Sequence, residues 1–481
     1  MIVKANCQRA ATTASVIAGH DTGERAIDAA ASTKIAAMPR TAAAVVLALA
    51  LAPPASAQAP DWNGLGAEAV KTLQDYVRIN TSNPPGDVTK AADYLQALLT
   101  REGIEAVHYE SGPGRSILLA RLKGDGSGGK AILLESHMDV VPTDPARWNV
   151  DPFAAQIADG KMWGRGTIDM KGIGTSYLYA FLALHRLKVP LTRDVLLLFV
   201  PDEEVGGEMG ATWMRKNHYA ELDPEYVIDE GGFGSRDMFT PGKLVFGISV
   251  AEKRIMWLRL RAEGVAGHGS QPHDKNPNEH LMAALGRLFA QPPAAAPFPV
   301  VDTMKARIGA PLTENKFNNA IQKSTISLTS LRSGVGDPPR ANVIPSVAEA
   351  TIDCRVLPGI SKEEWLAQLE TRLADPTIKI EIINAGEDPA VSPQDSPLYR
   401  ALAAAVQRQH PGAIVTPMTV PYGTDGNGFR PLGVKVYGFF PGIVPAASIL
   451  SMHGDAEFIP VDALAPAIRI LFDALKETAS R

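Results

Sequence analysis

The chain has 481 residues, of which 45% are hydrophobic and 21% are charged, a balance that is ordinary for a globular protein. This length exceeds the usual size of one hydrophobic core, so we expect two domains. A net charge of −5 and the lack of any long lysine or arginine run argue against nucleic acid as the partner. A small-molecule substrate is favoured instead.

The longest apolar stretch lies near the N-terminus, over residues 41–52, directly after Arg40. It is too short for a comfortable membrane span and ends in Ala55-Ser56-Ala57, a small-x-small cleavage pattern. We therefore predict a leader over residues 1–57 with a signal peptide cleaved after Ala57, and a secreted or periplasmic protein with no stable membrane span. Met38 is the expected translation start; the alternative is that residues 1–37 form an unusually long n-region of the signal peptide. The alternative to a cleaved signal peptide is an uncleaved anchor, which would lack a charged polar face.

Only two cysteines occur, Cys7 in the leader and Cys354. The mature chain therefore has no internal disulfide, although export would permit one. Cys354 lies in a run of alternating apolar and polar residues, where we expect a buried structural role.

The first predicted domain covers residues 58–248. Apolar residues recur at helical spacing in several segments, while continuous apolar runs predict strands buried on both faces. The expected helices are 61–80, 91–102, 172–187 and 207–217, and the expected strands are 116–122, 130–135 and 195–200. This alternation favours an α/β fold in which helices cover both faces of a mostly parallel sheet.

A second domain of α+β type is predicted over residues 249–385. Residues 254–261 alternate apolar and polar side chains, as a half-exposed antiparallel strand does. Further strands are expected over 324–331 and 348–356, with helices over 278–288 and 361–373, and a long exposed insertion between about 291 and 322. The first domain resumes over 386–481, with helices at 396–409 and 461–478 and a strand at 434–440. The small domain is therefore expected to be an insertion in the large one.

Acidic and histidine side chains follow the predicted strands. His137 and Asp139 form a His-x-Asp pair, in which the carboxylate can support a metal-bound imidazole through its other ring nitrogen. Asp169 lies in a glycine-rich turn, where a lone carboxylate can bridge ions, or cap the helix that follows. Taken singly, a pair such as His137 and Asp139 is more often a surface histidine beside an acid, and a residue such as Asp169 is more often a helix cap.

The pair Glu203-Glu204 after a buried strand is harder to dismiss. Adjacent carboxylates repel one another unless a cation or a proton intervenes. Neighbouring side chains in an extended segment point in different directions, so one can bind a metal while the other faces the substrate as a general base.

Asp229-Glu230 and His453 complete the set of candidate ligands. Two histidines and three carboxylates suit two zinc-like ions that share one carboxylate. Nitrogen and oxygen ligands without cysteine favour Zn²⁺, with Co²⁺ or Mn²⁺ as substitutes.

These motifs, in this order, resemble those of the M20 metallopeptidases, a family that includes aminoacylases, glutamate carboxypeptidases and succinyl-diaminopimelate desuccinylases. The resemblance spans about residue 61 to the C-terminus and rests on five segments. They are His137-Met138-Asp139, Gly166 to Gly172, Asp202 to Gly206, Asp229-Glu230-Gly231 and Met452-His453-Gly454. It implies a zinc-dependent exopeptidase-type catalytic domain with an inserted lid or dimerisation domain.

The resemblance also implies individual roles. His137 and Glu230 would hold one zinc ion, Glu204 and His453 the other, and Asp169 would bridge the two. Glu203 would act as the general base and Asp139 would orient His137. Asp229 competes with Glu230 for the ligand role, and the resemblance favours Glu230.

The small domain and the last segment contribute further candidates. His268 resembles the family's lid histidine, which polarises the scissile carbonyl, often across a dimer interface; a lone loop histidine is otherwise structural. Asn342 and Arg355 match substrate-contacting positions, and an arginine can bind a carboxylate through two hydrogen bonds. Asn342 could instead turn the chain, and Arg355 could pair with a nearby acid. Gly423 and Thr424 resemble a loop near the substrate carboxylate, or form a plain turn.

We therefore expect an exported zinc hydrolase that cleaves an amide or peptide bond next to a free carboxylate, as a carboxypeptidase or dipeptidase does. Its substrate would be a small peptide, and a homodimer through the lid domain is possible under the resemblance. One alternative is an aminoacylase-like enzyme acting on N-acyl amino acids. Another is an exported protein that binds a ligand with its metals and does not turn it over; it would not need Glu203.

Overall fold

The computed structural model describes residues 60–386 and 389–481. The predicted leader, with Met38 and the cleavage site after Ala57, lies outside the described residues. Within the described ranges, no helix is both long enough and apolar enough to cross a membrane.

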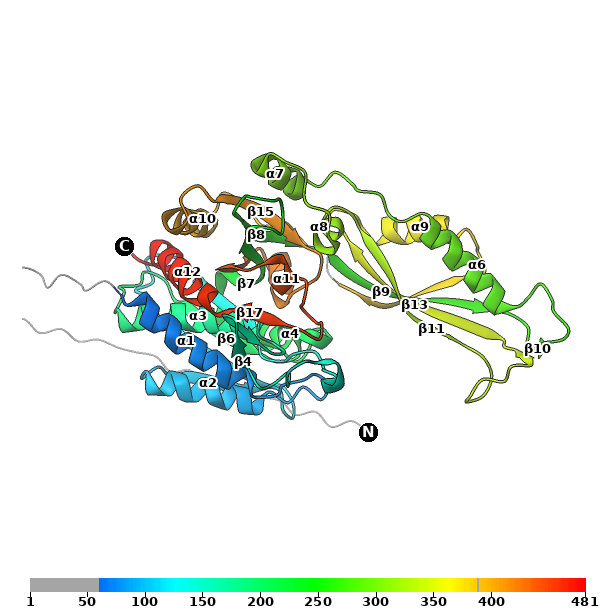
Figure 1. Cartoon of the computed structure of the whole chain (residues 1–481), viewed down its shortest axis with the longest axis horizontal. Coiled ribbons are helices and arrows are strands. Elements are labelled where there is room, and N and C mark those ends of the chain that lie inside the picture. Colours follow the sequence, from blue (N-terminus) through cyan, green and yellow to red (C-terminus); the bar gives the residue numbers. More distant parts are fainter. Residues whose placement is uncertain (1–59, 387–388) are drawn as a thin grey trace, which may run out of the picture. The chain divides into compact units, whose positions relative to one another are not determined.

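A large mixed sheet forms the core of the main part of the molecule (Figure 1). Its strand order is β1 (Ala106–Glu110), β2 (Ser116–Leu122), β6 (Val195–Val200), β3 (Ala131–His137), β7 (Pro224–Ser235), β16 (Lys435–Ile443), β8 (Val245–Glu252) and β15 (Ile414–Val420). The central strands β6, β3, β7 and β16 run parallel, whereas β2 is antiparallel to β6 and β8 is antiparallel to β7. This arrangement confirms the predicted α/β class with its mostly parallel sheet.

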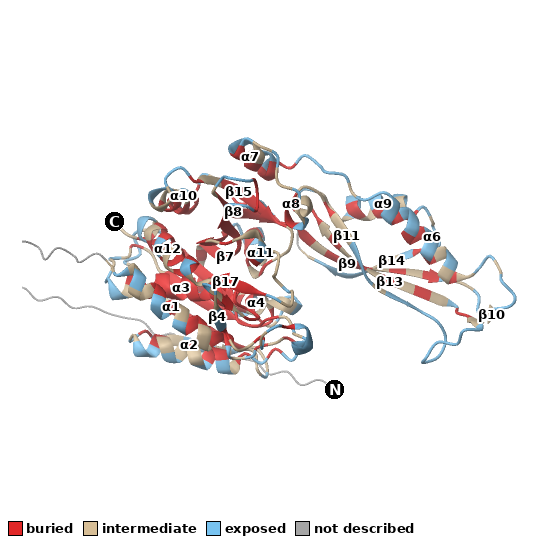
Figure 2. Cartoon of the chain, in the orientation of Figure 1, coloured by how far each residue is buried: buried red, intermediate tan, exposed pale blue. Residues whose placement is uncertain are grey.

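Both faces of this sheet are buried, as the continuous apolar runs predict (Figure 2). In β6, Leu197 packs into one hydrophobic cluster and its neighbour Leu198 into another, because successive side chains of a strand point to opposite faces. Helices that supply the first cluster are α1 (Trp62–Val77), α2 (Thr89–Arg101), α3 (Lys171–Arg186), α10 (Pro397–Gln409) and α12 (Leu464–Ala479). The second is supplied by α4 (Ala211–Asn217), α5 (Tyr219–Leu222) and the 3₁₀ segment η3 (Asp425–Leu432). The helices predicted from apolar spacing in these regions are therefore confirmed.

A second, antiparallel sheet has the order β11 (Thr325–Ser333), β13 (Val347–Val356), β9 (Arg254–Glu263) and β14 (Lys379–Ala385). Burial alternates along β9, which confirms its predicted half-exposed character. Helices α6 (Pro277–Ala290) and α9 (Lys362–Leu373) contribute to a separate core on the inner face. Cys354 is fully buried in this core, consistent with a structural role.

The prediction of an exposed insertion between residues 291 and 322 is wrong in part, since residues 291–297 are mostly exposed and form no helix or strand, but the rest of the segment is not. From Phe298 on, it forms α7 (Pro299–Ile308) and α8 (Lys316–Ile321), whose large apolar residues are buried in the core of the large sheet. Val300, Met304 and Ile308 lie on one face of α7, but the helix is too short and too close to prolines to show a clear period. Phe317 of α8 packs edge-on against Phe233 of β7.

The remaining short elements lie in connections. They are β4 (Gln156–Ala158), β5 (Lys161–Trp163) and β17 (Phe458–Pro460), which form a three-stranded sheet; the pair β10 (Gly267–His268) and β12 (Val343–Ile344); and η1 (Pro145–Arg147), η2 (Glu203–Val205), α11 (Ala446–Ile449) and η4 (Val461–Ala463).

Lys253 is the single residue between β8 and β9, and its side chain is fully buried. Its Nζ has no hydrogen-bond partner among the residues that the structure describes. Burial, reinforced by the charges of Arg355 and Lys323, lowers the pKa of Lys253 to about 7. In the unfolded chain this amine keeps a pKa near 10.4, so the lysine is fully charged there at neutral pH, whereas in the folded protein it is charged only in part.

We expect Lys253→Met to raise the melting temperature at pH 6, because the folded protein no longer buries an unpaired cation. The free energy of unfolding should rise by roughly 5 kcal/mol. Below pH 7 the lysine is charged in both states and its burial costs most. Between pH 7 and about 10.5 the unfolded chain alone holds the proton, so the wild-type protein gains stability and the advantage of the methionine variant shrinks. Thermal melts of both proteins from pH 6 to 10 measure this convergence, and a constant difference would contradict it.

Candidate active site

The candidate ligands converge where parallel strands end. His137 is the last residue of β3, Glu203 and Glu204 follow β6 in the η2 turn, and Glu230 lies on β7. Because these three strands are parallel neighbours, their C-terminal ends meet at one edge of the sheet.

Two candidates come from connections outside these strands. Asp169 lies just before α3, and His453 lies between α11 and β17. His453 adopts a left-handed φ of 61°, which is uncommon for a residue other than glycine and clusters at functional sites.

The first ligand group consists of His137, Asp169 and Glu230, and all three are buried. His137 Nε2 lies 3.3 Å from Asp169 Oδ1 and 3.8 Å from Glu230 Oε1. The other ring nitrogen, Nδ1, is 2.9 Å from the carbonyl oxygen of Asp139 and donates to it in the tautomer that leaves Nε2 free for a ligand.

The second group consists of Asp169, Glu204 and His453. His453 Nε2 lies 3.1 Å from Asp169 Oδ2 and 3.2 Å from Glu204 Oε2. Each oxygen of Asp169 thus faces a different histidine, so this carboxylate belongs to both groups. Two ion sites sharing one carboxylate is the arrangement that the sequence pattern predicts.

The charges of these residues fit bound cations. Burial and the Asp169 charge raise the pKa of Glu230 well above its usual value, and the same two causes raise that of Glu204. Burial alone would lower the pKa of His453, but Asp169 and Glu204 raise it to about 11. One Glu204 oxygen, Oε1, is buried without a partner in the described part of the chain. The site therefore favours positive charge, and its two imidazoles and three carboxylates suit divalent ions such as Zn²⁺ or Mn²⁺.

The Asp139 carboxylate makes contacts that its sequence position does not reveal. Its oxygens lie 3.2 and 3.3 Å from the backbone nitrogens of Glu203 and Glu204 and accept hydrogen bonds from them. The nearest carboxylate oxygen is 3.7 Å from His137 Nδ1, farther than the carbonyl oxygen. Asp139 thus contacts His137 chiefly through its backbone and holds the Glu203-Glu204 turn through its side chain.

Glu203 is half-buried beside the ligand groups but belongs to neither. Burial raises the pKa of its carboxyl well above the usual value, and the Glu204 charge adds to the rise.

Asp229, the competitor of Glu230, is directed away from both ligand groups, since its two oxygens accept from the backbone nitrogens of Glu230 and Gly426, each at 2.7 Å.

A cleft with a volume of about 750 Å³ opens onto these residues. Asp169, Glu203, Glu204, Glu230 and His453 all line it. Three of the predicted substrate-binding residues, Arg355, Gly423 and Thr424, line the same cleft.

Comparison with known proteins decides the family. The description Peptidase family M20/M25/M40 matches residues 133–477, which is well over half of the chain. The chain belongs to the M20 peptidase family.

Two curated M20 relatives illustrate its closeness to enzymes of known activity. The human protein named N-fatty-acyl-amino acid synthase/hydrolase PM20D1 is 30% identical over 387 residues, covering 74% of this chain and 76% of its own. Rat aminoacylase-1A is 27% identical over 379 residues, covering 78% of this chain and 86% of its own. This M20 chain is accordingly a hydrolase that acts on amide or peptide bonds.

A solved M20 structure supports the fold. The metallo-carboxypeptidase Sso-CP2 of Sulfolobus solfataricus aligns with a TM-score of 0.67 and 20% identity, over 85% of this chain and 99% of its own. The mostly parallel catalytic sheet with a lid domain is therefore the M20 architecture.

Two of the residues expected from the M20 pattern lie apart from the cleft. His268 on β10 is exposed, and its Nδ1 accepts from the Ser270 hydroxyl at 2.7 Å. Asn342 is also exposed, and its carbonyl oxygen accepts from Gly269 N. Neither lines the cleft, so their roles stay predictions.

Arg355 lines the M20 cleft but is already paired. Its Nε and Nη2 lie 2.8 and 3.0 Å from the two carboxylate oxygens of Asp353. The structure thus confirms the alternative interpretation of Arg355, in which it pairs with a nearby acid, although Arg355 also lines the cleft.

Asn83 was not found from the M20 sequence pattern. Its Nδ2 donates to Asp139 at 2.8 Å and lies 3.3 Å from an oxygen of Asp202. Asp202 is also paired with Arg115 at 3.3 Å and has a left-handed φ of 80°. These residues come from distant segments, so no local spacing could have signalled that they support the Glu203-Glu204 turn.

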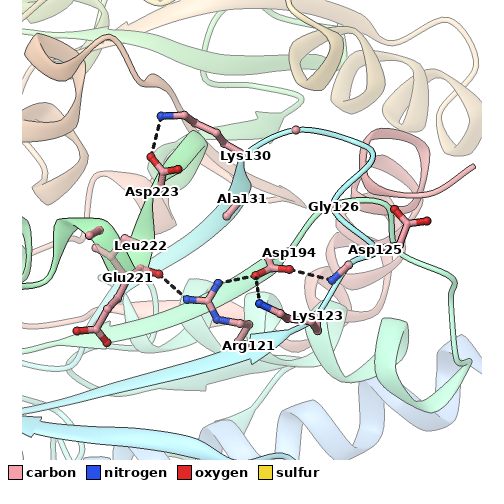
Figure 3. Close-up of a pocket in the computed structure, with 13 residues that line it drawn as sticks. Arg121, Lys123, Asp125, Gly126, Lys130, Ala131, Asp194, Glu221, Leu222 and Asp223 are labelled. Atoms are coloured by element: carbon pink, nitrogen blue, oxygen red, sulfur yellow. Dashed lines mark hydrogen bonds and ion pairs between the residues drawn. The ribbon is translucent and has the colours of Figure 1, made fainter. Parts of the chain in front are cut away.

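A second hollow lies away from the M20 site, near the start of β3 (Figure 3). Its charged residues neutralise one another, since Arg121 pairs with Asp194 at 2.5 Å and Lys130 with Asp223 at 2.7 Å. Because these charges are paired, we assign this hollow no part in the reaction.

Proposed function

We propose that the chain hydrolyses N-acyl amino acids with the help of two zinc ions, held by the two ligand groups. The observation that carries this proposal is the apolar wall of the cleft. Phe317, Ile449, Leu450 and Met452 line the cleft beside the ligand His453. An apolar wall next to the reacting centre suits a hydrocarbon acyl group better than a charged peptide.

The named activities of the relatives agree with this choice. Both the human and the rat relatives have names that refer to acyl amino acids. The Sulfolobus protein is named a carboxypeptidase, but at 20% identity its likeness supports the fold alone. The preference is the reverse of the order expected from the sequence, in which a carboxypeptidase or dipeptidase came first.

The chemistry assigns a distinct task to Glu203. Bound divalent ions polarise an amide carbonyl and acidify water. The Glu203 carboxylate takes the proton of the attacking water and then passes it to the nitrogen of the leaving amino acid. Glu203 is suited to both steps, because it lines the cleft and belongs to neither ligand group.

The free carboxylate of the leaving amino acid needs a cationic or hydrogen-bonding partner. Arg355 lies in the cleft, and the loop of Gly423 and Thr424 lies there too. We assign the carboxylate to this side of the cleft, with Asp353 holding the Arg355 guanidinium in a fixed orientation.

A carboxypeptidase or dipeptidase activity is the second candidate. Glu208 also lines the cleft, and a carboxylate there could pair with the free amino group of a dipeptide. In this structure Glu208 forms an exposed ion pair with Lys216 at 3.1 Å, whereas the apolar wall lies beside His453. We therefore place this activity second.

A hydrolysis panel separates the two candidates. The zinc-loaded protein is assayed with N-acyl amino acids of increasing chain length and with dipeptides of matched side chains, and release of the amino acid is measured. A kcat/KM that is higher for N-acyl substrates supports the proposal. Preference for dipeptides would reverse it, and no turnover of either class would reject both.

We expect Leu450→Asn to lower kcat/KM for a long-chain N-acyl amino acid by about tenfold or more, because it puts an amide in the apolar wall. The N-acetyl substrate, which cannot reach far along the wall, should change little. Leu432→Asn is the matched control, since Leu432 is 52% exposed and does not line the cleft. An equal fall for both chain lengths would contradict the assigned role of the wall.

Export and dimer formation complete the proposal. Export rests on the leader of residues 1–57, and N-terminal sequencing of the exported protein should begin at Gln58. A homodimer through the small domain rests on the family resemblance, and the mass in solution tests it.

A further inference from the structure

The two ligand segments that meet at the second metal group are linked by one buried ion pair. Glu457, just before β17, is fully buried, and Arg165, in the turn before Asp169, is 2% exposed. Arg165 Nη1 donates to Glu457 Oε2. The pair joins two segments that are almost 300 positions apart in the chain.

Each partner also bonds to the backbone of a ligand segment. Glu457 Oε1 accepts from the backbone nitrogens of Ile168, at 3.0 Å, and Asp169, at 3.3 Å. Arg165 Nη2 donates to the carbonyl oxygen of Gly454 at 3.0 Å. The ion pair therefore holds the backbone of Asp169 on one side and the residue after His453 on the other.

His453 needs such support more than the other ligands do. Its φ is left-handed, and its side chain is 53% exposed, so little packing holds it. The Gly454 carbonyl is fixed by Arg165, which limits how the His453 backbone can move. His137, in contrast, is 1% exposed at the end of a central strand.

We propose that the Arg165–Glu457 pair is a positioning element that sets the distance between Asp169 and His453, and thereby the affinity for the ion bound by Asp169, Glu204 and His453. The proposal rests on the metal centre and is independent of which amide bond is cleaved. Residues that orient metal ligands typically change metal affinity by about 10- to 100-fold when they are replaced.

The chain contains a matched comparison. Arg430 and Glu252 form another ion pair, with both side chains 2% exposed. Glu252 Oε2 accepts from the backbone nitrogen of Thr424 at 2.7 Å, so this pair holds the loop on the substrate side of the cleft. The described contacts of Glu252 and Arg430 involve no metal ligand.

The test compares two double variants, Arg165→Met with Glu457→Gln, and Arg430→Met with Glu252→Gln. In each, both charges are removed together, so no buried charge is left unpaired. The metal-free full chains are titrated with Zn²⁺ by calorimetry, and the zinc content is measured after dialysis. Melting of the metal-free proteins reports whether each variant is folded.

The first double variant is expected to keep one tightly held ion and to bind the other about 10- to 100-fold more weakly. The second double variant should bind both ions as the wild type does, while its KM for substrate rises. Arg165→Lys keeps the charge but cannot make both hydrogen bonds, so it should lower the affinity for the same single ion to a smaller extent. This variant replaces the double variant if the latter does not fold.

Unchanged affinity for both ions in the Arg165 variants would overturn the proposal. An equal loss of affinity for both ions would also overturn it, because the pair would then act on the shared ligand Asp169 and not on its distance to His453. Equal losses in the two double variants would overturn it as well, because a general loss of stability would then explain the result. Wild-type protein that binds no divalent ion would instead reject the metal centre itself, so the two failures are distinguishable.

Discussion

Glu203→Gln is expected to lower kcat by about 10²- to 10⁴-fold while the protein keeps both divalent ions. The amide cannot accept the proton of the attacking water, but Glu203 lies outside both ligand groups, so the ligand set is intact. Steady-state hydrolysis and zinc content are measured on the same preparation.

The matched control for this change is Glu370→Gln, because Glu370 is an exposed glutamate on α9. It should leave both kcat and zinc content as they are in the wild type. If Glu203→Gln turned over substrate at the wild-type rate, the general base would have to be another residue. If it lost zinc, Glu203 would be a ligand.

The second large effect is expected for Asp169→Asn, which should reduce bound zinc from about two ions per chain to about none. Asp169 is the one residue present in both ligand groups, and each of its oxygens faces a different histidine. A neutral amide offers one weak oxygen ligand in place of two anionic ones. Zinc per chain after dialysis measures the loss.

Glu230→Gln provides the comparison, since Glu230 belongs to the first group alone. It should remove or weaken one ion and leave the one bound with Glu204 and His453. If Asp169→Asn also retained one ion, Asp169 would not be a bridging ligand.

The parts of the site that follow strand ends could be predicted from sequence. His137, Glu204 and Glu230 each end or follow an apolar run, and the ends of parallel strands necessarily meet. The expectation of two ion sites likewise follows from counting histidines and carboxylates. These features are local, so a short window of sequence contains them.

The supporting contacts could not be predicted, because they join distant segments. Asn83 reaches Asp139, and Glu457 reaches the backbone of Asp169, but neither residue carries a local mark of that contact. A buried glutamate near a strand looks the same in sequence whether it binds an arginine, a metal or the backbone.

The fold of the insertion was missed for a related reason. The helix α7 buries Val300 and Met304 against the large sheet, but prolines and alanines before it suggest an exposed linker. Which core a short amphipathic helix joins depends on tertiary packing, and α8 in turn brings Phe317 to the cleft.

The unequal exposure of the two histidines has a consequence for how the centre is assembled. His453 is 53% exposed and His137 only 1%, so the two sites differ in their access to solvent. We therefore expect an ion held with His137 to exchange with the solvent more slowly than an ion held with His453.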